Sequence, residues 1–544
     1  MKRKLLKVIG ISFLIYVVLS WIIPVGTYSN GELTTNGIDP VGLIDLFNAP
    51  IQAFITFILY GVVFATIGGL YGVMERTGAL EKVTDRMSHA FEGKERVFLV
   101  ITVVLFTLLS SITGLILPLF VLVPLFAAVL FAMNFDKVTV LASTVGSLLV
   151  GSVASTYGFN ITGYTANLLA LDMNNQIVAK VILLVLLTIV LCAVVLMTSK
   201  KDMKKELKEA KMNKEEKEVK EVKEEKKVKA SETKTAKKKA AATSSKKTSK
   251  ESTKKAPKTT AKKASTKTTG KKKSTKGKAN TKAFAVAKPV KKVSEKSKVS
   301  AVPMVIIFLL MLIVCLIGMY NWYYSFGIEV FSNIHEAIMG VQIGDFPIFE
   351  HLLSGVSELG YWSNIDLAAM MIIASAIIAW IYRLSFNDYM ESFIAGVKKW
   401  LPTAIYAALA SVILYILYQA SYAGTGTLVD TINAKIFDLT DGFNVLTTGA
   451  ASLIGSFFYN DLYYLLAALT SFVSGFDAAS LSVAGLLIQS VYGVAMLIFP
   501  TSVILVAGLS LFDVSYKEWM KYIWKFALIA LLLVLLTCGI VTLL

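Results

Sequence analysis

Long apolar runs separated by short polar or charged links make up most of this chain. Since a helix needs about 20 apolar residues to cross a bilayer, we expect nine of the runs to span it. They lie at 8–25, 50–74, 138–171, 177–198, 302–320, 364–382, 400–420, 479–511 and 525–543. With 55% hydrophobic residues in addition, the pattern predicts an all-α polytopic membrane protein.

Two further apolar runs, 97–133 and 442–475, are too long for one helix. Each is interrupted near its middle, by "LLSSITG" (108–114) in the first and by "FFYND" (457–461) in the second. We expect each run to form a re-entrant hairpin that enters and leaves on one face. A pair of full spans would preserve the same sidedness, so the pattern leaves both arrangements open.

Basic residues at the ends of the runs predict an orientation. The cluster Lys2, Arg3, Lys4 and Lys7 places the N-terminus in the cytoplasm, because links rich in Lys and Arg stay inside. Counting crossings from there puts every short basic cluster and residues 199–300 in the cytoplasm, and the C-terminus outside. The N-terminal stretch lacks a small-x-small cleavage site, so we expect a retained first helix in the cytoplasmic membrane.

The order of spans occurs twice. The order is span, span, hairpin, long broken span and span, and it is found first in 1–198. The same order follows 302–320, which is an extra helix that inverts the second copy relative to the first. We therefore expect a first membrane repeat (1–198), a Lys-rich cytoplasmic insert (199–300), and a linker helix with a second, inverted repeat (301–544). Inverted repeats are typical of secondary transporters.

Two spans contain residues that favour an unwound helix. The stretch "GSLLVGSVASTYGFNITGYTANLL" (146–169) is rich in glycine and hydroxyl groups, and "LLIQSVYGVAMLIFPTSVILVAG" (486–508) contains Pro500. Glycine weakens a helix and proline removes a donor, which leaves carbonyls and half-helix N-termini to hold ions or substrates. The alternative is that these small residues serve close helix packing.

One acidic residue lies inside the second interrupted run. Burying an ionised carboxylate at membrane depth costs several kcal/mol, so Asp461 is a candidate functional group. We hypothesise that it binds a coupling ion or the amino group of a substrate. The alternative is that it marks a short loop between two helices at the membrane surface.

The net charge of +18 belongs to one segment. Residues 199–300 hold 37 of the 55 Lys and Arg residues and 12 of the 37 Asp and Glu residues, a net charge of +25 against −7 for the remainder. We expect a charged helix over 201–229 and disorder over 230–300, which lacks apolar periodicity. Anionic lipid is the expected partner of the insert, and nucleic acid is the less favoured one.

Several stretches resemble a known family. "GGLYGVMERTGAL" (68–80), "GSVASTYGFN" (151–160) and "LIQSVYGVAMLIFPTSVILVAGLSLFDVSYKEWMKYI" (487–523) are similar to the YfcC-like branch of the C4-dicarboxylate anaerobic carrier (DcuC-like) family. The resemblance covers both membrane halves and omits the insert. It implies the fold of the ion transporter superfamily, in which two re-entrant hairpins and two broken transmembrane helices enclose the substrate, and it implies a homodimer.

The resemblance also implies binding residues at the two hairpin tips and the two unwound segments. They are Ser110, Ser111 and Thr113 at the first tip, Tyr459, Asn460 and Asp461 at the second, Ser155, Thr156 and Asn160 in the first unwound segment, and Gln489, Ser490, Thr501 and Ser502 in the second. The family usually has Gly-Glu-Glu at the first tip, where this chain has Ser, Ile and Thr. We expect no cofactor and no metal beyond a coupling Na⁺ or H⁺, with Na⁺ near Asn160 and Asp461.

These expectations favour a secondary active transporter of small organic acids or amino acids that works by alternating access, as a symporter or an antiporter. The alternative is a membrane anchor or a channel whose basic insert binds nucleic acid or anionic lipid. An enzyme is not expected, because the sequence has no phosphate-binding loop, zinc-ligand set or nucleophile–base constellation. The substrate and the coupling ion stay open.

Overall fold

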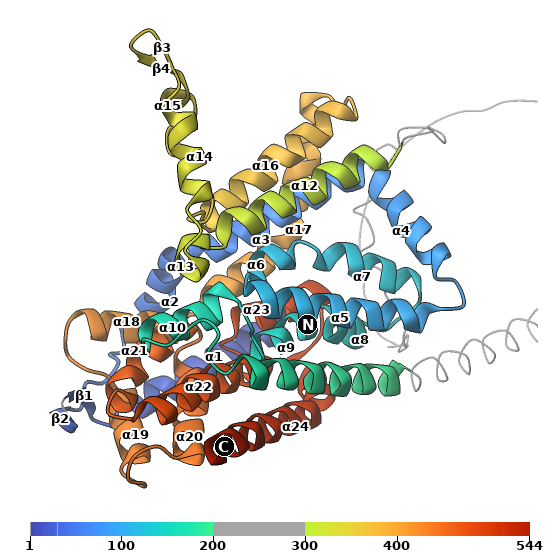
Figure 1. Cartoon of the computed structure of the whole chain (residues 1–544). Helices are drawn as coiled ribbons and strands as arrows, with labels where there is room; N and C mark the ends of the chain where they lie inside the picture. Colours follow the sequence, from blue (N-terminus) through green and yellow to red (C-terminus); the bar gives the residue numbers. More distant parts are fainter. Residues whose placement is uncertain (1, 30, 200–299) are drawn as a thin grey trace, which may run out of the picture. The chain divides into compact units, whose positions relative to one another are not determined.

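Helices account for almost all of the described chain (Figure 1). The computed structural model describes residues 2–29, 31–199 and 300–544. Within these ranges, eight helices are long and apolar enough to cross a bilayer, and the strands form two short hairpins. The prediction of an all-α polytopic membrane protein is confirmed. The predictions for the Lys-rich insert fall on residues outside the described ranges.

The first part of the chain leads into a helical hairpin. Its elements are α1 (Lys2–Ser20), β1 (Val25–Ser29), β2 (Glu32–Gly37), α2 (Asp45–Thr56), α3 (Ile58–Thr77), α4 (Ala79–Ala90), α5 (Glu95–Thr113), α6 (Ile116–Phe120) and α7 (Val123–Ala132). The chain reverses after α5 at Gly114, which has a left-handed φ of +66°. Helix α7 then runs back beside α5 (Figure 1).

The long apolar run 138–171 is a series of short pieces. They are α8 (Lys137–Leu141), the π-helical turn η1 (Ala142–Gly146), α9 (Ser147–Val153), the π-helical turn η2 (Phe159–Gly163) and α10 (Tyr164–Leu168). The backbone is not helical between Val153 and Phe159. This break contains Ser155, Thr156 and Gly158, whose types disfavour a continuous helix. A helix over Ile177–Ser199 completes this half.

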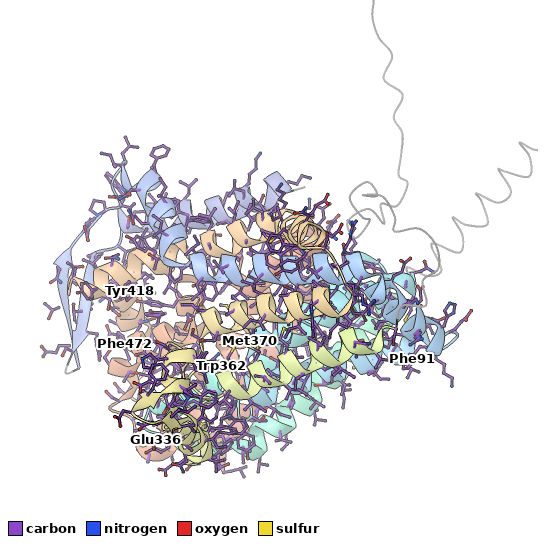
Figure 2. All side chains as sticks on the ribbon, turned by 90° about the horizontal axis from the view of Figure 1, so that it is seen from above. Phe91, Glu336, Trp362, Met370, Tyr418 and Phe472 are labelled. Carbon is purple, nitrogen blue, oxygen red and sulfur yellow. The ribbon has the colours of Figure 1, made fainter. Side chains whose placement is uncertain are left out.

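The second half begins with one helix and an arm of short elements. They are α12 (Val302–Met319), α13 (Trp322–Phe326), α14 (Val330–Met339), β3 (Gln342–Ile343), β4 (Phe346–Pro347) and α15 (Ile348–Leu352). Figure 2 labels Glu336 on α14 of this arm. No residue of α14 or α15 is buried.

The remaining helices contain the second hairpin and two further breaks. They are α16 (Asn364–Ile381), α17 (Phe386–Leu409), α18 (Val412–Tyr422), α19 (Leu428–Phe437), α20 (Val445–Phe458), α21 (Leu462–Val473), α22 (Ala478–Ile498), α23 (Val503–Phe512) and α24 (Tyr516–Leu543). The interrupted run 442–475 is the pair α20 and α21. Breaks separate α17 from α18 and α22 from α23.

The predicted span 400–420 starts too late and contains a break, whereas its end agrees with the end of α18 at Tyr422. Helix α17 begins fourteen residues earlier because Ser385 caps it, its Oγ accepting the N–H of Asp388 at 3.1 Å. The helix then stops at Leu409, and a second helix starts at Val412. The intervening Ala410 and Ser411 form a break that the sequence pattern did not predict.

Helices α3 and α17 hold the two halves of the chain together. A methyl group on Gly396 would lie 2.0 Å from the carbonyl O of Gly68, so only glycine allows this approach. At one end of the same interface Arg76 pairs with Asp388, and Lys399 Nζ lies 3.1 Å from a Glu75 carboxylate oxygen. The stretch "GGLYGVMERTGAL" is therefore a helix-packing face.

Contacts between the ends of the spans fall into two sets. One set joins links that the sequence analysis places in the cytoplasm: Lys137 with Asp513, Tyr382 with Ser300, and Arg76 with Asp388. The other joins links placed outside: Gly26 with Thr427, and Gln176 with Ser482. The contacts agree with a two-sided arrangement, while the orientation relative to the cytoplasm and the repeat boundaries remain predictions.

Candidate substrate and ion site

The tip of the first hairpin is hydrogen-bonded to the first helix break. Ser111 Oγ donates to the carbonyl O of Ala154 at 2.6 Å, and the Thr156 N–H donates to the carbonyl O of Ser111 at 3.0 Å. Ser155 Oγ donates to the same Ser111 oxygen at 3.3 Å. The polar groups freed after α9 are therefore satisfied largely by the hairpin tip.

Two glycines allow this tip and this break to touch. A methyl group on Gly114 would lie 2.8 Å from the Cα of Gly158, and its positive φ disfavours any other residue. A methyl group on Gly158 would lie 2.4 Å from Ser155 Oγ. Backbone therefore contacts backbone at this point, which leaves no room for a ligand between the two glycines.

The tip of the second hairpin is hydrogen-bonded to two other breaks. The side-chain amide of Asn460 donates to the carbonyl O of Thr501 at 2.7 Å and to Ser411 Oγ at 3.0 Å. Tyr492 Oη, on α22, donates to the carbonyl O of Asn460 at 3.0 Å. This one side chain thus joins the hairpin to the α22–α23 break and to the α17–α18 break.

Gln489 and Ser490 lie inside a helix, which corrects the prediction that they belong to an unwound segment. Helix α22 continues without interruption to Ile498, and its first unpaired position comes at Pro500, which has no N–H to donate. The break therefore comprises Phe499–Ser502, and it begins nine residues beyond Ser490. Residues before a proline can keep their own helical hydrogen bonds, which the sequence argument overlooked.

Gln489 nevertheless reaches the first break. Its Nε2 donates to the carbonyl O of Ser155 at 3.3 Å, across the contact between α22 and α9. The two helices approach closely because position 493 is glycine, where a methyl group would lie 2.5 Å from the Cα of Val153. One side chain of the second half thus binds the unwound backbone of the first.

Four buried polar atoms in this region have no hydrogen-bond partner among the described residues. They are Asn460 Oδ1, Gln489 Oε1, Ser490 Oγ and Thr501 Oγ1. Their side chains are at most 8% exposed. An unpaired buried polar atom costs about 1–3 kcal/mol, so the four together favour a bound ion or substrate group. Unpaired buried atoms also occur elsewhere among the described residues, as on Asn433 and Thr448.

The other predicted site residues either have their side-chain hydrogen bonds satisfied by the protein or lie outside the helix breaks. Ser110 Oγ donates to the carbonyl O of Leu148 at 2.6 Å, and Thr113 Oγ1 donates to that of Leu109 at 2.7 Å. Ser502 caps α23. Asn160 is half-buried on η2, beyond the break. The first tip therefore serves as a scaffold, and the open polar groups lie at the second tip and on α22.

Asp461 caps the N-terminus of α21, where its carboxylate accepts the N–H of Tyr463 at 3.0 Å. It is half-buried, and Tyr60 of α3, Tyr164 of α10 and Tyr492 of α22 lie close enough to interact with its charge. Elements of both halves thus surround the carboxylate. This arrangement disfavours the alternative of a surface loop.

The positive ends of two helices meet at the second tip. Helix α21 begins at Leu462 and α23 begins at Val503, and Asn460 and Thr501, which precede them, are in direct contact. Helix N-termini carry partial positive charge and favour anions. Asp461 occupies one of these ends. The end of α23 has only the neutral Ser502 hydroxyl as its cap, so it can accept a carboxylate.

Residues 3–243 match the family model described as C4-dicarboxylate anaerobic carrier, DcuC. The matched range contains the first hairpin and the first break. The matched residues make up less than half of the chain, and over them it is similar to the DcuC carriers. This similarity supports a transporter in general, and the YfcC-like branch remains a prediction. Neither the search of curated proteins nor the search of solved structures gave a match.

The structure also reveals charged residues that the sequence reasoning missed. Lys180 is only 2% exposed on the Ile177–Ser199 helix, and it was not among the candidate site residues. Asp430, on α19, lines a cavity rather than a solvated link. A single charge inside an apolar run was the available signal for Lys180. For Asp430 there was no such signal, because capping residues commonly lie in solvent.

Proposed function

We propose that this protein is a secondary active transporter of small organic acids or amino acids that works by alternating access. The cluster of unpaired atoms on Asn460, Gln489, Ser490 and Thr501 supports the proposal. A membrane anchor has no use for such a cluster at the meeting point of a hairpin tip and a helix break. The proposal involves no catalytic step.

The cluster has the chemistry of a sodium site. Two of its atoms are amide oxygens, of Asn460 and Gln489, and two are hydroxyl oxygens, of Ser490 and Thr501. Hard cations prefer oxygen ligands, and broken helices of transporters hold Na⁺ with such groups. We propose that these oxygens, rather than Asn160, contribute ligands to the coupling Na⁺. Asp461 is then available for a proton or for the amino group of a substrate.

A substrate carboxylate would bind at the start of α23. That end offers backbone N–H groups and the positive end of the helix, next to the proposed sodium ion. An amino acid would place its ammonium group toward Asp461, whereas a dicarboxylate would lack that attraction. Whether uptake depends on the Asp461 carboxylate therefore distinguishes an amino-acid substrate from a dicarboxylate.

Alternating access would proceed by movement at the hairpin tips. Each tip is held by few hydrogen bonds, those of Ser111 on one side and those of Asn460 on the other. Breaking the second set would open the cluster from one side while the α3–α17 interface stays closed. Gating of one element against a fixed partner is a common way for transporters to alternate.

Uptake by proteoliposomes containing the purified full-length chain tests the proposal. Labelled succinate, arginine and a neutral amino acid would be supplied in turn, under separately imposed Na⁺ and H⁺ gradients. We expect one class to accumulate under one gradient, and accumulation to be lost in Gln489→Leu but kept in Thr102→Ala. Thr102 is a suitable control because it is also buried, but its hydroxyl is bonded to the carbonyl O of Phe98 at 2.8 Å.

The other outcomes are equally informative. Exchange of preloaded substrate without net accumulation would identify an antiporter. Absence of both uptake and exchange, in protein shown to be folded by its thermal transition, would contradict secondary transport.

The proposal also includes the assembly and location. We propose a homodimer in the cytoplasmic membrane, with the N-terminus and the 199–300 insert in the cytoplasm and the C-terminus outside. Light scattering of the purified protein tests the dimer, and labelling of single cysteines at the two ends tests the orientation. Liposomes with and without anionic lipid test the insert, and preferential binding of nucleic acid would contradict the proposed lipid contact.

A further inference from the structure

A cavity of about 410 Å³ lies on the outer side of the second hairpin, by the predicted orientation. Strand β1, the end of α18, the start of α19 and helix α21 line it. Figure 2 shows Tyr418, from its lining, and the nearby Phe472 at the same end of the described chain as the β1–β2 hairpin. The hairpin is attached there through the pairing of Gly26 with Thr427.

Aromatic rings dominate the walls of this cavity. Six of its fourteen lining residues are tyrosines. Tyr418 and Tyr464 pack edge to face with their ring centroids 5.8 Å apart, and Tyr464 packs against Tyr463 at 5.6 Å. Tyr459 is 5% exposed and directly precedes Asn460 of the candidate site. Tyrosine faces carry negative electrostatic potential and attract cations.

Asp430 supplies the single formal charge in the lining. Its Oδ2 accepts the Thr427 N–H at 3.2 Å and the Thr427 hydroxyl at 2.9 Å, which completes the cap of α19. No lysine or arginine lines the cavity, and Lys435 of the same helix lies 4.0 Å from Asp438 instead.

The carboxylate is thus desolvated without a counter-ion. Burial raises the pKa of Asp430 to about 6, and the two bonds from Thr427 only partly oppose this effect. Asp430 is the third residue of the α19 capping box, a position where the neutral amide of glutamine makes the same bond, so the cap by itself does not need a carboxylate. Nor does it need a surrounding of tyrosine rings.

We propose that this cavity binds a small organic cation, such as a quaternary ammonium or a protonated amine, with Asp430 as its counter-ion and Tyr418, Tyr459 and Tyr464 as its aromatic walls. A carboxylate beside several aromatic faces is the arrangement that recognises ammonium groups. None of the four residues with unpaired oxygens in the candidate site lines this cavity. The inference therefore holds whether or not the chain uses an ion gradient.

Binding of choline to the purified full-length chain tests this proposal. Equilibrium dialysis would compare labelled choline with its uncharged isostere, 3,3-dimethylbutan-1-ol, at equal concentration. We expect choline to bind at least about tenfold more tightly, since the two differ mainly in charge. Asp430→Asn should remove most of that difference, because asparagine keeps the size and the capping oxygen of aspartate.

Asp477→Asn is the matched control. Asp477 also caps a helix, accepting the N–H groups of Ala479 and Ser480 at 3.0 Å, but it does not line the cavity. This variant should bind choline like the unchanged protein. Tyr464→Leu provides a second test that leaves the cap intact, and it should also weaken choline binding. Equal binding of choline and its isostere, or choline affinity that survives both Asp430→Asn and Tyr464→Leu, would overturn the proposal.

Discussion

The side-chain amide of Asn460 donates to the carbonyl oxygen of Thr501 at 2.7 Å, which joins the tip of one hairpin to the break in a distant helix. The other side-chain atom of Asn460, Oδ1, is buried without a partner among the described residues. One residue therefore both closes the structure and offers an oxygen to a ligand.

Replacing Asn460 should affect transport more than folding. We expect Asn460→Leu to reduce the initial rate of uptake by at least about tenfold, because it removes both the bond to Thr501 and the free oxygen. The lost bonds to Thr501 and Ser411 should lower the stability by about 1–3 kcal/mol, partly offset by removal of the unpaired oxygen, so the protein should still fold. A variant with unchanged uptake would exclude Asn460 from the site.

Ser111 and Gln489 should respond in opposite ways. Ser111→Ala removes the bond to the carbonyl O of Ala154, so we expect about 1–2 kcal/mol lower stability and a modest loss of uptake. Gln489→Leu removes an unpaired buried oxygen together with the long 3.3 Å bond to Ser155, so the two effects on stability should roughly cancel while uptake is lost. Thermal melts and uptake rates measured on the same preparations check both, and the reverse pattern would contradict the assignment of scaffold and ligand roles.

The charge of Asp461 can be tested without removing its cap. Asp461→Asn keeps an oxygen for the Tyr463 N–H, so the start of α21 should stay intact. We expect lower uptake and a changed dependence on pH or Na⁺. If uptake keeps the same rate and the same dependence on both, Asp461 has no part in the mechanism.

Choline binding should weaken in acid. Asp430 has a raised pKa of about 6, so the carboxylate is charged above that pH and becomes neutral below it. A neutral carboxyl cannot act as a counter-ion. Affinity measured from pH 7.5 to 5 should therefore fall through about pH 6, and Asp430→Asn should abolish this dependence.

The α3–α17 interface should not tolerate a side chain at position 396. Gly396→Ile would place Cβ 2.0 Å from the carbonyl O of Gly68, so we expect a loss of more than about 3 kcal/mol or failure to fold. Gly539→Ile is the control, because a methyl group there meets nothing within 4 Å. Size-exclusion profiles and thermal melts of the two variants give the comparison, and a normal Gly396→Ile protein would contradict the packing.

Much of the fold follows from local pattern. Apolar runs of membrane length, glycine and hydroxyl clusters and Pro500 are visible in the sequence, because each changes the helix in which it lies. They were enough to predict a helical membrane protein, two hairpins and the break after α22. The break at Ala410–Ser411 had no such local signal.

The composition of the candidate site depends on contacts between distant segments. Ser111, Ser155, Gln489 and Asn460 have similar polarity, and the sequence could only group them as equivalent binding residues. The tertiary structure separates them, because neighbours from other helices satisfy the first two side chains and leave an oxygen of each of the others unpaired. The surroundings of Asp430 also depend on tertiary structure, because tyrosines from other elements line the cavity beside it. The sequence by itself thus determined where the chain can be helical and apolar, whereas packing decided which polar groups remain available to a ligand.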